Sequence, residues 1–409
     1  MMTRLKIHAC AFRIPAIVFG GGINGLGVVR NLGRNGVTVY CVVEKKEEVI
    51  YSKFCDKYYI VPHIEEDKSV LRKFLISTGR LNSHAVLFPT SDRFSLHLSE
   101  LKEEFSEDYY VPLPSQEIVR TLVDKREFYK SLSQFSVPHP GTYFPESQED
   151  ARRISTEMKY PIFVKPLLSQ EFGLKFNTKG FVADSADELM KYYLLARNHR
   201  FEVIFQEVIP GLAGENMYGI EGYFDKNSDP KAIFAYRRLR GWPPVFGNTC
   251  LRESIPTSDV ADLCAVTENY LRHIGYNGLM EAEWKKDPQT GVYYLLEINA
   301  RQSMQNALPS ICGMNLILIA YLDAIGEKTG RVDNYEKGVK WQSLPQDLFS
   351  VLTTHPSMTN LVVSLRNIQA WSFFATDDLL PWIVSNFETT RTIVFRIFQA
   401  ARMHMRLYT

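Results

Sequence analysis

Apolar and polar side chains alternate along the stretch Leu-Leu-Glu-Ile-Asn-Ala-Arg at residues 295–301. Successive side chains of an extended chain point to opposite faces, so one face of this strand is apolar and the other is polar. The apolar face carries Leu296, Ile298 and Ala300, and the polar face carries Glu297, Asn299 and Arg301. Burying a carboxylate, an amide and a guanidinium without partners would be costly. We therefore expect polar groups or a polar ligand opposite this face.

The first third of the chain alternates short apolar runs with helix-like sequence. The apolar runs lie at 15–19, 37–43, 57–61 and 84–88. Strands that alternate with helices in this way predict a parallel sheet covered by helices. Pro112 and Pro114 indicate that this domain ends near residue 115.

The region from there to about residue 330 has a different pattern, in which strand-like runs follow one another more closely. These runs lie at 162–165, 203–208, 217–224, 231–238, 279–285 and 293–300, and helical patterns lie at 186–196, 257–273 and 309–325. The short segment Asp-Pro-Gln-Thr-Gly at 287–291 predicts a hairpin between the last two strands. We expect a mixed, largely antiparallel sheet with helices here, followed by a C-terminal extension at 331–409.

Composition narrows the function classes. A chain of 409 residues with 45% hydrophobic residues can form two or three domains. The 47 Lys and Arg nearly balance the 46 Asp and Glu, which argues against a nucleic-acid partner. Six scattered cysteines without a CxxC pair predict reduced structural thiols and no zinc site. We find no signal-peptide core and no apolar run long enough to cross a bilayer, so a cytoplasmic protein is expected.

A glycine-rich segment at 20–25 fits the GxGxxG pattern between a strand and a helix. Glu44 lies at the end of the next strand, 19 residues after Gly25. This spacing is typical of a dinucleotide site, in which the acid binds ribose. An NAD(P)-dependent oxidoreductase is therefore one hypothesis. The pattern alone is weak evidence, because any tight strand-to-helix turn favours glycine.

The predicted hairpin points to a different chemistry. Its first strand alternates Glu281, Glu283 and Lys285 with apolar residues. The turn brings the chain back antiparallel, so we expect Glu283 to lie near Glu297 and Asn299. Two carboxylates and an amide oxygen are hard ligands suited to Mg²⁺. The alternative is a solvated sheet face with cross-strand charge pairs.

The chain also resembles a known family. An acid followed 14 residues later by Glu-x-Asn at the end of a strand is similar to the magnesium site of ATP-grasp enzymes. Five further segments resemble that family, at 124–128 and 161–166 (nucleotide-binding lysines), 206–211 (interdomain hinge), 236–244 (a basic strand) and 275–278 (before the hairpin). The similarity spans about residues 14–325 in the family's order. It is greatest to the carboxylate–amine ligases, in a branch similar to D-aspartate ligases.

The resemblance implies an ATP-grasp fold, with α/β and α+β parts and an N-terminal Rossmann-like domain. The implied domains are 1–115, 116–330 with a hinge near 206–211, and 331–409 as a small C-terminal extension. That extension would end in a basic amphipathic helix with Arg391, Arg396, Arg402 and Arg406 on one side. We expect this helix to pack on its own chain or on a partner subunit rather than on a membrane surface.

The resemblance also implies a role for individual residues. ATP would be bound by Lys125, Lys165, Gln206, Glu207, Val208, Ile209 and Glu215, with Lys175 or Lys179 as a further phosphate contact. Mg²⁺ or Mn²⁺ would be held by Glu283, Glu297 and Asn299. Arg301 and Lys165 would take part in catalysis, and the substrate candidates are Gly22, Asn24, Asp92, Arg238 and Arg252. One departure is the segment 167–175, which has a single glycine where the family has a flexible glycine-rich loop.

The implied reaction joins a carboxylate to an amine. ATP would convert the carboxylate into an acyl phosphate, and attack by the amine would release phosphate. The partners would be small-molecule substrates, and the resemblance leaves a homodimer open. Three alternatives remain. Two are the NAD(P)-dependent oxidoreductase and an ATP-grasp module that binds ligand without turnover. The third is an ATP-grasp enzyme whose acceptor is a thiol or whose carboxylate is bicarbonate.

Overall fold

A computed structural model describes residues 14–387, apart from 80–83, 168, 213, 244–246, 355–361 and 363–365. The basic helix expected at the C-terminus, within 389–409, lies outside the described residues. The chain forms two compact units, each with its own internal packing. The first unit comprises Met1–Leu113, Arg301–Leu344 and Asn367–Thr409, and the second comprises Pro114–Ala300 and Pro345–Arg366. The domain boundaries expected at 115 and 330 stay predictions.

The first unit contains the parallel sheet that the sequence predicts. Its strands lie in the order β3-β2-β1-β4-β5 and all neighbouring pairs are parallel. They are β1 (Ala16–Phe19), β2 (Val39–Val43), β3 (Lys57–Ile60), β4 (Ala85–Pro89) and β5 (Tyr109–Tyr110). The connections contain α1 (Gly22–Gly33), η2 (Glu48–Tyr51), α2 (Lys68–Gly79) and α3 (Asp92–Leu101). Ile17, Phe19, Leu87 and Phe94 are completely or almost completely buried in the core of this sheet.

Segments from the end of the chain complete the first unit. They are α10 (Ala307–Ile311), α11 (Leu316–Ala324), β15 (Lys340–Gln342) and β16 (Ile368–Trp371), and the two strands pair in parallel. The sequence predicts one helix over 309–325, but Gly313 breaks it with a φ of 94°. Asn315 then caps α11, because its side-chain oxygen accepts from the Leu318 N–H at 3.0 Å.

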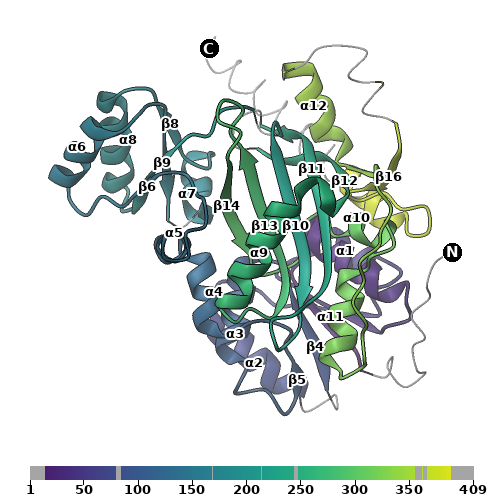
Figure 1. The fold of residues 1–409 in the computed structure, drawn as a ribbon. Helices are drawn as coiled ribbons and strands as arrows, with labels where there is room; N and C mark the ends of the chain where they lie inside the picture. The colour runs from purple at the N-terminus through teal and green to yellow at the C-terminus, as the bar shows by residue number, and fades with distance from the viewer. Residues whose placement is uncertain are drawn as a thin grey trace, which may run out of the picture. The chain divides into compact units, whose positions relative to one another are not determined.

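The second unit begins with helices α4 (Gln116–Val123) and α5 (Lys125–Gln134) and a four-stranded antiparallel sheet. The strand order is β6-β9-β7-β8, from β6 (Thr142–Tyr143), β9 (Val203–Glu207), β7 (Ile162–Pro166) and β8 (Phe181–Ala183). Its helices are α6 (Gln148–Glu157), α7 (Ser169–Phe176) and α8 (Ala186–Asn198). Ile162, Phe172, Leu189 and Phe205 belong to its core. Figure 1 shows α6 and α8 lying beside each other next to this sheet.

A larger antiparallel sheet fills the rest of the second unit (Figure 1). Its strands follow the order β14-β13-β10-β11-β12, and helix α9 (Ala261–His273) contacts β10. The strands are β10 (Met217–Phe224), β11 (Pro230–Trp242), β12 (Asn248–Ile255), β13 (Gly278–Lys286) and β14 (Tyr293–Asn299). The short helix η3 (Thr257–Val260) precedes α9, and α12 (Leu344–Thr354) follows later in the chain. The hairpin of β13 and β14 is present as predicted.

Candidate active site

The β13–β14 hairpin places the polar residues of the two strands opposite one another. Glu283 pairs with Glu297, and Glu281 pairs with Asn299. A bulge after Glu283 shifts the register by one residue, so that the next pair is Trp284 with Leu295. Trp284 is 1% exposed, and its indole N–H donates to Thr267 on α9. This anchors the apolar face of β13 on the helix, while the carboxylates lie on the opposite face.

Glu283 lies at the centre of this polar face. Its two carboxylate oxygens accept from one guanidinium nitrogen of Arg238 at 3.1 and 3.2 Å. The pKa of Glu283 is raised to about 7, mainly by burial. The nearby carboxylates of Glu297 and Glu281 contribute to this rise, whereas Arg238 and Lys179 oppose it. A buried carboxylate that faces other carboxylates is a position where an additional cation is favourable.

Arg252 on β12 pairs with Arg238 in the register of the same sheet, and its side chain is completely buried. Its guanidinium binds Glu221 at 2.5 Å, lies 3.7 Å from Glu281 and stacks 4.2 Å from the centroid of the Tyr236 ring. We expected Arg252 as a substrate residue. In this structure its charge is used by two buried glutamates, so it is not presented to a small molecule. Arg238 is likewise 8% exposed and is paired with Glu283.

Lys179 is the lysine that the structure brings toward the carboxylates. The residue retains exposed surface, and its ammonium donates to Asn248 at 2.7 Å. Loss of water around the ammonium lowers the pKa of Lys179, and the charges of Glu297 and Glu283 partly oppose this. Lys175, the other candidate left open by the sequence, is exposed on α7.

The two other lysines of the predicted nucleotide site lie on regular elements. Lys165 is on β7, and its positive charge contributes to lowering the pKa of Lys179, after the larger effect of burial. Lys125 is the first residue of α5, after Asp124 caps that helix. Its ammonium donates to the Leu167 carbonyl oxygen at 2.8 Å, at the start of the segment that leads into α7.

The predicted hinge begins at the end of β9. Gln206 is 6% exposed and donates to Thr142 at 2.9 Å, while Glu207 accepts from the Gly141 N–H at 3.2 Å. Val208 and Ile209 follow this strand outside any helix or strand. Glu215 accepts from the Leu212 N–H at 2.9 Å and so closes the next turn.

One lysine that sequence reasoning did not select supports this turn. Lys285 donates to the Gly211 carbonyl oxygen at 2.8 Å. Burial lowers the pKa of Lys285 to about 8, and the neighbouring Arg238 lowers it as well. The alternation of Glu281, Glu283 and Lys285 along β13 was the signal that could have identified it.

The donor set fits a magnesium ion that is completed by substrate. Among the described residues, no group of three or more His, Cys, Asp or Glu is arranged to hold a metal ion by itself. Glu283 and Glu297 face each other across the hairpin, and Asn299 adds an amide oxygen. Mg²⁺ is typically held by one or two carboxylates together with substrate phosphates. Burial and the facing carboxylates raise the pKa of Glu283, and a cation bound beside it would relieve both effects.

In the first unit, a second group of predicted residues lies where β4 ends. Arg301 forms an ion pair with Asp92 at 2.8 Å. Asn24 donates to the Thr90 carbonyl oxygen at 2.9 Å, and its own side-chain oxygen accepts from Asn306 at 3.1 Å. This arrangement fixes the start of α1 against the segment that follows Arg301.

The glycine loop of the first unit is organised around a carboxylate of the protein itself. The Gly22 N–H at the start of α1 donates to Glu47, and a Cβ atom on Gly21 would lie 2.1 Å from the Glu47 carboxylate. Burial raises the pKa of Glu47, and Glu48 raises it further. Glu44, the acid expected at ribose, accepts from the Glu65 N–H at 3.1 Å. Both features that suggested a dinucleotide thus have partners within the chain.

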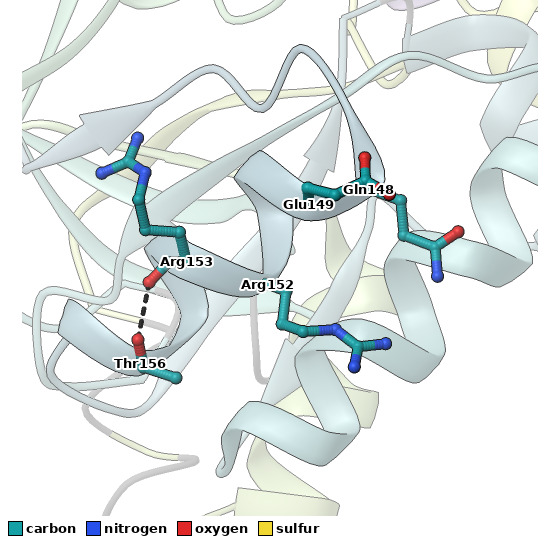
Figure 2. Close-up of a pocket in the computed structure, with 5 residues that line it drawn as sticks. All are labelled: Gln148, Glu149, Arg152, Arg153 and Thr156. Atoms are coloured by element: carbon teal, nitrogen blue, oxygen red, sulfur yellow. Dashed lines mark hydrogen bonds between the residues drawn. The ribbon is translucent and has the colours of Figure 1, made fainter.

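A surface hollow of about 540 Å³ lies elsewhere, along α6. It is lined by Gln148, Glu149, Arg152, Arg153 and Thr156, all from that helix. Figure 2 shows these side chains spread around the helix, with Thr156 donating to the Arg153 carbonyl oxygen. The residues of the predicted nucleotide and metal sites do not line it.

Comparisons with known proteins bear on the fold and the family. No family model matches the chain. A curated D-aspartate ligase from Enterococcus faecium is 22% identical over 364 residues, which cover 81% of this chain and 83% of that protein. The chain also matches the carbamoyl phosphate synthase large chain of Pyrococcus furiosus with 24% identity over 70% of this chain, but it spans only 27% of that protein's length.

Two solved structures share the architecture. The biotin carboxylase domain of 2-oxoglutarate carboxylase from Hydrogenobacter thermophilus, solved with MgADP, ADP and bicarbonate, superposes with a TM-score of 0.63 and 15% identity. That match covers 80% of this chain and 73% of the other. The N5-carboxyaminoimidazole synthetase of Staphylococcus aureus also gives a TM-score of 0.63, with 13% identity and coverage of 84% and 86%.

These structural matches confirm the predicted fold. No helix in the described part of the chain has the length and apolarity that a bilayer span requires. The match to D-aspartate ligase extends over most of both chains, in keeping with the order of the motifs. The chain therefore has the ATP-grasp fold, and it is distantly similar over most of its length to a D-aspartate ligase, an ATP-grasp carboxylate–amine ligase.

Proposed function

We propose that this enzyme uses ATP to join a small carboxylic acid to an amine. One of these two substrates is an amino acid or a similar compound. The carboxylate attacks the γ-phosphorus of ATP and displaces ADP, which gives an acyl phosphate. The amine then attacks the acyl carbon, and phosphate leaves with the C–O bond electrons. The observation that carries this proposal is the pairing of Glu283 with Glu297, next to Asn299, on a highly charged hairpin.

Different residues of the second unit would bind the phosphates, the adenine and the ribose of ATP. Lys125 and Lys165 would neutralise phosphate oxygens, since a lysine ammonium offers rotatable donors. Main-chain groups at 207–209 would form hydrogen bonds with adenine. This segment begins at the last residue of β9, and its residues 208 and 209 lie outside any helix or strand. Glu215 would accept from the ribose hydroxyls. Lys179 is the better candidate for a further phosphate contact than Lys175, because it lies within the field of Glu283 and Glu297.

Glu283, Glu297 and Asn299 would hold Mg²⁺, and the bound ion would stabilise the negative charge that develops on the phosphate oxygens during transfer. Arg238 keeps Glu283 in place through both carboxylate oxygens. Arg301 lies two residues after Asn299 in the chain and is held by Asp92. We assign Arg301 to the transferring phosphoryl group or the acyl phosphate, where a guanidinium can bind two oxygens. Gly22, Asn24 and Asp92 remain candidates for the second substrate.

Release of ADP tests the proposal directly. Pairs of amino acids and small acids are incubated with Mg·ATP, and the ADP formed is measured for the wild type, Glu297→Gln and Asn299→Ala. We expect both variants to lose at least about a hundredfold in ADP formation, since each removes a metal ligand used in the transition state. Circular dichroism should show that they remain folded, because both side chains serve the ligand rather than the core.

Thermal shift separates this proposal from the oxidoreductase. A ligand that binds only the native state at a hundredfold excess over its Kd adds about 2.7 kcal/mol to the unfolding free energy. Mg·ATP should raise the melting temperature, and NAD or NADP should not. Stabilisation by NAD alone, or full activity in both variants, would contradict the proposal. Binding of Mg·ATP without ADP release from any substrate pair would favour a module that only binds ATP.

A further inference from the structure

Glu281 is a buried glutamate of β13 that the nucleotide and metal assignments leave without a role. It is 4% exposed and pairs with Asn299 across the hairpin. The Asn299 side-chain nitrogen Nδ2 donates to Glu281 Oε2 at 3.2 Å. The NH₂ group and the oxygen of a carboxamide are on opposite branches, so this contact determines which way the amide faces.

The other oxygen of Glu281 has its own donors. Tyr236 donates its hydroxyl to Glu281 Oε1 at 2.9 Å, and the Arg252 guanidinium lies 3.7 Å from the same atom. Tyr236 is 1% exposed and Arg252 is completely buried. The carboxylate is thus oriented by donors on one side and presents its second oxygen to Asn299. A carboxylate accepts at both oxygens and donates at neither, which makes the direction of each bond unambiguous.

The backbone is shaped to permit this network. Gly219 on β10 lies between Tyr236 on β11 and Glu283 on β13 in the sheet register. A Cβ atom at Gly219 would lie 2.0 Å from the Tyr236 ring, so any larger residue would displace the ring. The absence of a side chain lets the phenol reach across β10 toward Glu281. The buried network is therefore continuous from β12 to β14.

We propose that Glu281 is a positioning residue, which fixes the Asn299 amide so that its oxygen Oδ1 faces the divalent cation. The inference rests on the proposed function, because it concerns the same metal site. Asn299 without this contact could present its NH₂ group, which cannot ligate a cation. Groups that orient metal ligands in this way typically change metal affinity by about 10–100-fold when they are replaced.

The substitution Glu281→Gln tests the orientation of the Asn299 amide, because glutamine has almost the same shape as glutamate. The introduced amide would place its oxygen toward Arg252, because a guanidinium has no acceptor. Its NH₂ group would then face Asn299 and accept no hydrogen bond from it. Asn299 would turn its oxygen toward the introduced amide and its NH₂ group toward the cation. We expect the affinity for Mn²⁺ in the presence of ADP to fall at least about tenfold.

The substitution Asn299→Asp removes the need for orientation. Both oxygens of the introduced carboxylate can ligate a cation, and a further carboxylate near Glu281 and Glu283 favours cation binding. Asn299→Asp should therefore bind Mn²⁺ at least as tightly as the wild type. In the Glu281→Gln background the introduced NH₂ group can donate to one oxygen of the introduced aspartate, which leaves the other oxygen for the metal. The double variant should bind Mn²⁺ more tightly than Glu281→Gln alone.

Mn²⁺ binding is measured by electron paramagnetic resonance of the free ion, with ADP present, for the wild type, both single variants and the double variant. Glu253→Gln is the matched control, because Glu253 lies on the same sheet but is paired with the exposed Arg237. The control should retain wild-type affinity. Rescue in the double variant is the outcome that a purely structural role of Glu281 would not produce.

The outcomes separate the two proposals. If the wild type does not bind Mn²⁺ with ADP, the proposed function fails and the inference fails with it. If the wild type binds and Glu281→Gln binds equally well, only the inference is overturned. Should Glu281→Gln fail to fold, Tyr236→Phe decides instead, because it removes the hydroxyl that orients Glu281, and wild-type Mn²⁺ affinity of that variant overturns the positioning role.

Discussion

Replacing Arg252 by methionine would remove a buried cation that lies against both Glu221 and Glu281. Arg252 is completely buried, and the side chains of Glu221 and Glu281 are 2% and 6% exposed. The two glutamates are direct neighbours in the register of β10 and β13. Methionine fills much of the volume of the arginine stem, so the main change is the loss of charge and of hydrogen bonds.

The expected cost follows from this burial. Breaking a buried ion pair by removing one partner typically costs about 3–5 kcal/mol, because the remaining charge is left uncompensated in a medium that cannot solvate it. Arg252→Met leaves two such carboxylates facing each other. Arg237→Met is the matched control, since Arg237 lies on the adjacent strand, is 52% exposed and pairs with Glu253. An exposed pair of this kind contributes about 0–1 kcal/mol.

Urea unfolding followed by circular dichroism measures the difference. With an m-value of about 3 kcal/mol per M, the unfolding midpoint of Arg252→Met should fall by about 1 M or more, and that of Arg237→Met by no more than about 0.3 M. Equal midpoints for Arg252→Met and the wild type, together with a raised KM for one substrate, would refute the reasoning. That result would restore the assignment of Arg252 to substrate binding.

Two further pairs of variants test other parts of the structure. Lys179→Met should weaken ATP binding at least about tenfold, because Lys179 donates to Asn248 and lies in the field of the hairpin carboxylates. Lys175→Met should change ATP binding little, and equal effects of the two variants in a nucleotide titration would contradict this assignment. Asp378→Ala should lower the unfolding free energy by about 3–5 kcal/mol, because it leaves Arg30 buried without its carboxylate at 2.9 Å. Asp377→Ala removes an exposed pair and should cost about 0–1 kcal/mol in the same urea experiment, and similar losses in both variants would be inconsistent with this account.

Strand β12 shows where sequence reasoning missed an element. Its sequence, Asn-Thr-Cys-Leu-Arg-Glu-Ser-Ile, has buried polar residues at Arg252 and Ser254, so it lacks the apolar alternation of a half-buried strand. The burial of Arg252 depends on Glu221 and Glu281, which belong to two other strands. The segment at 167–175 has a single glycine where the family has a flexible glycine-rich loop, and the structure has helix α7 there.

The sequence by itself determined the local features of this protein. The period of two in β13 and β14, the turn between them and the spacing of Glu283, Glu297 and Asn299 are all set within about 20 residues, and neighbours at that range meet whenever the hairpin forms. The order of the motifs along the chain also predicted the ATP-grasp fold, and the structural matches confirm that prediction.

Tertiary structure decided which charged side chains belong to the site. Arg237 and Arg238 are adjacent in sequence, yet one is exposed on an outer face and the other is buried against Glu283. Glu281 and Glu283 are equally acidic in the sequence, but the first is held by Tyr236 and Arg252 and the second faces Glu297. The physical reason is that β10 lies between β11 and β13, and this arrangement sets the partners of Glu221, Glu281 and Glu283.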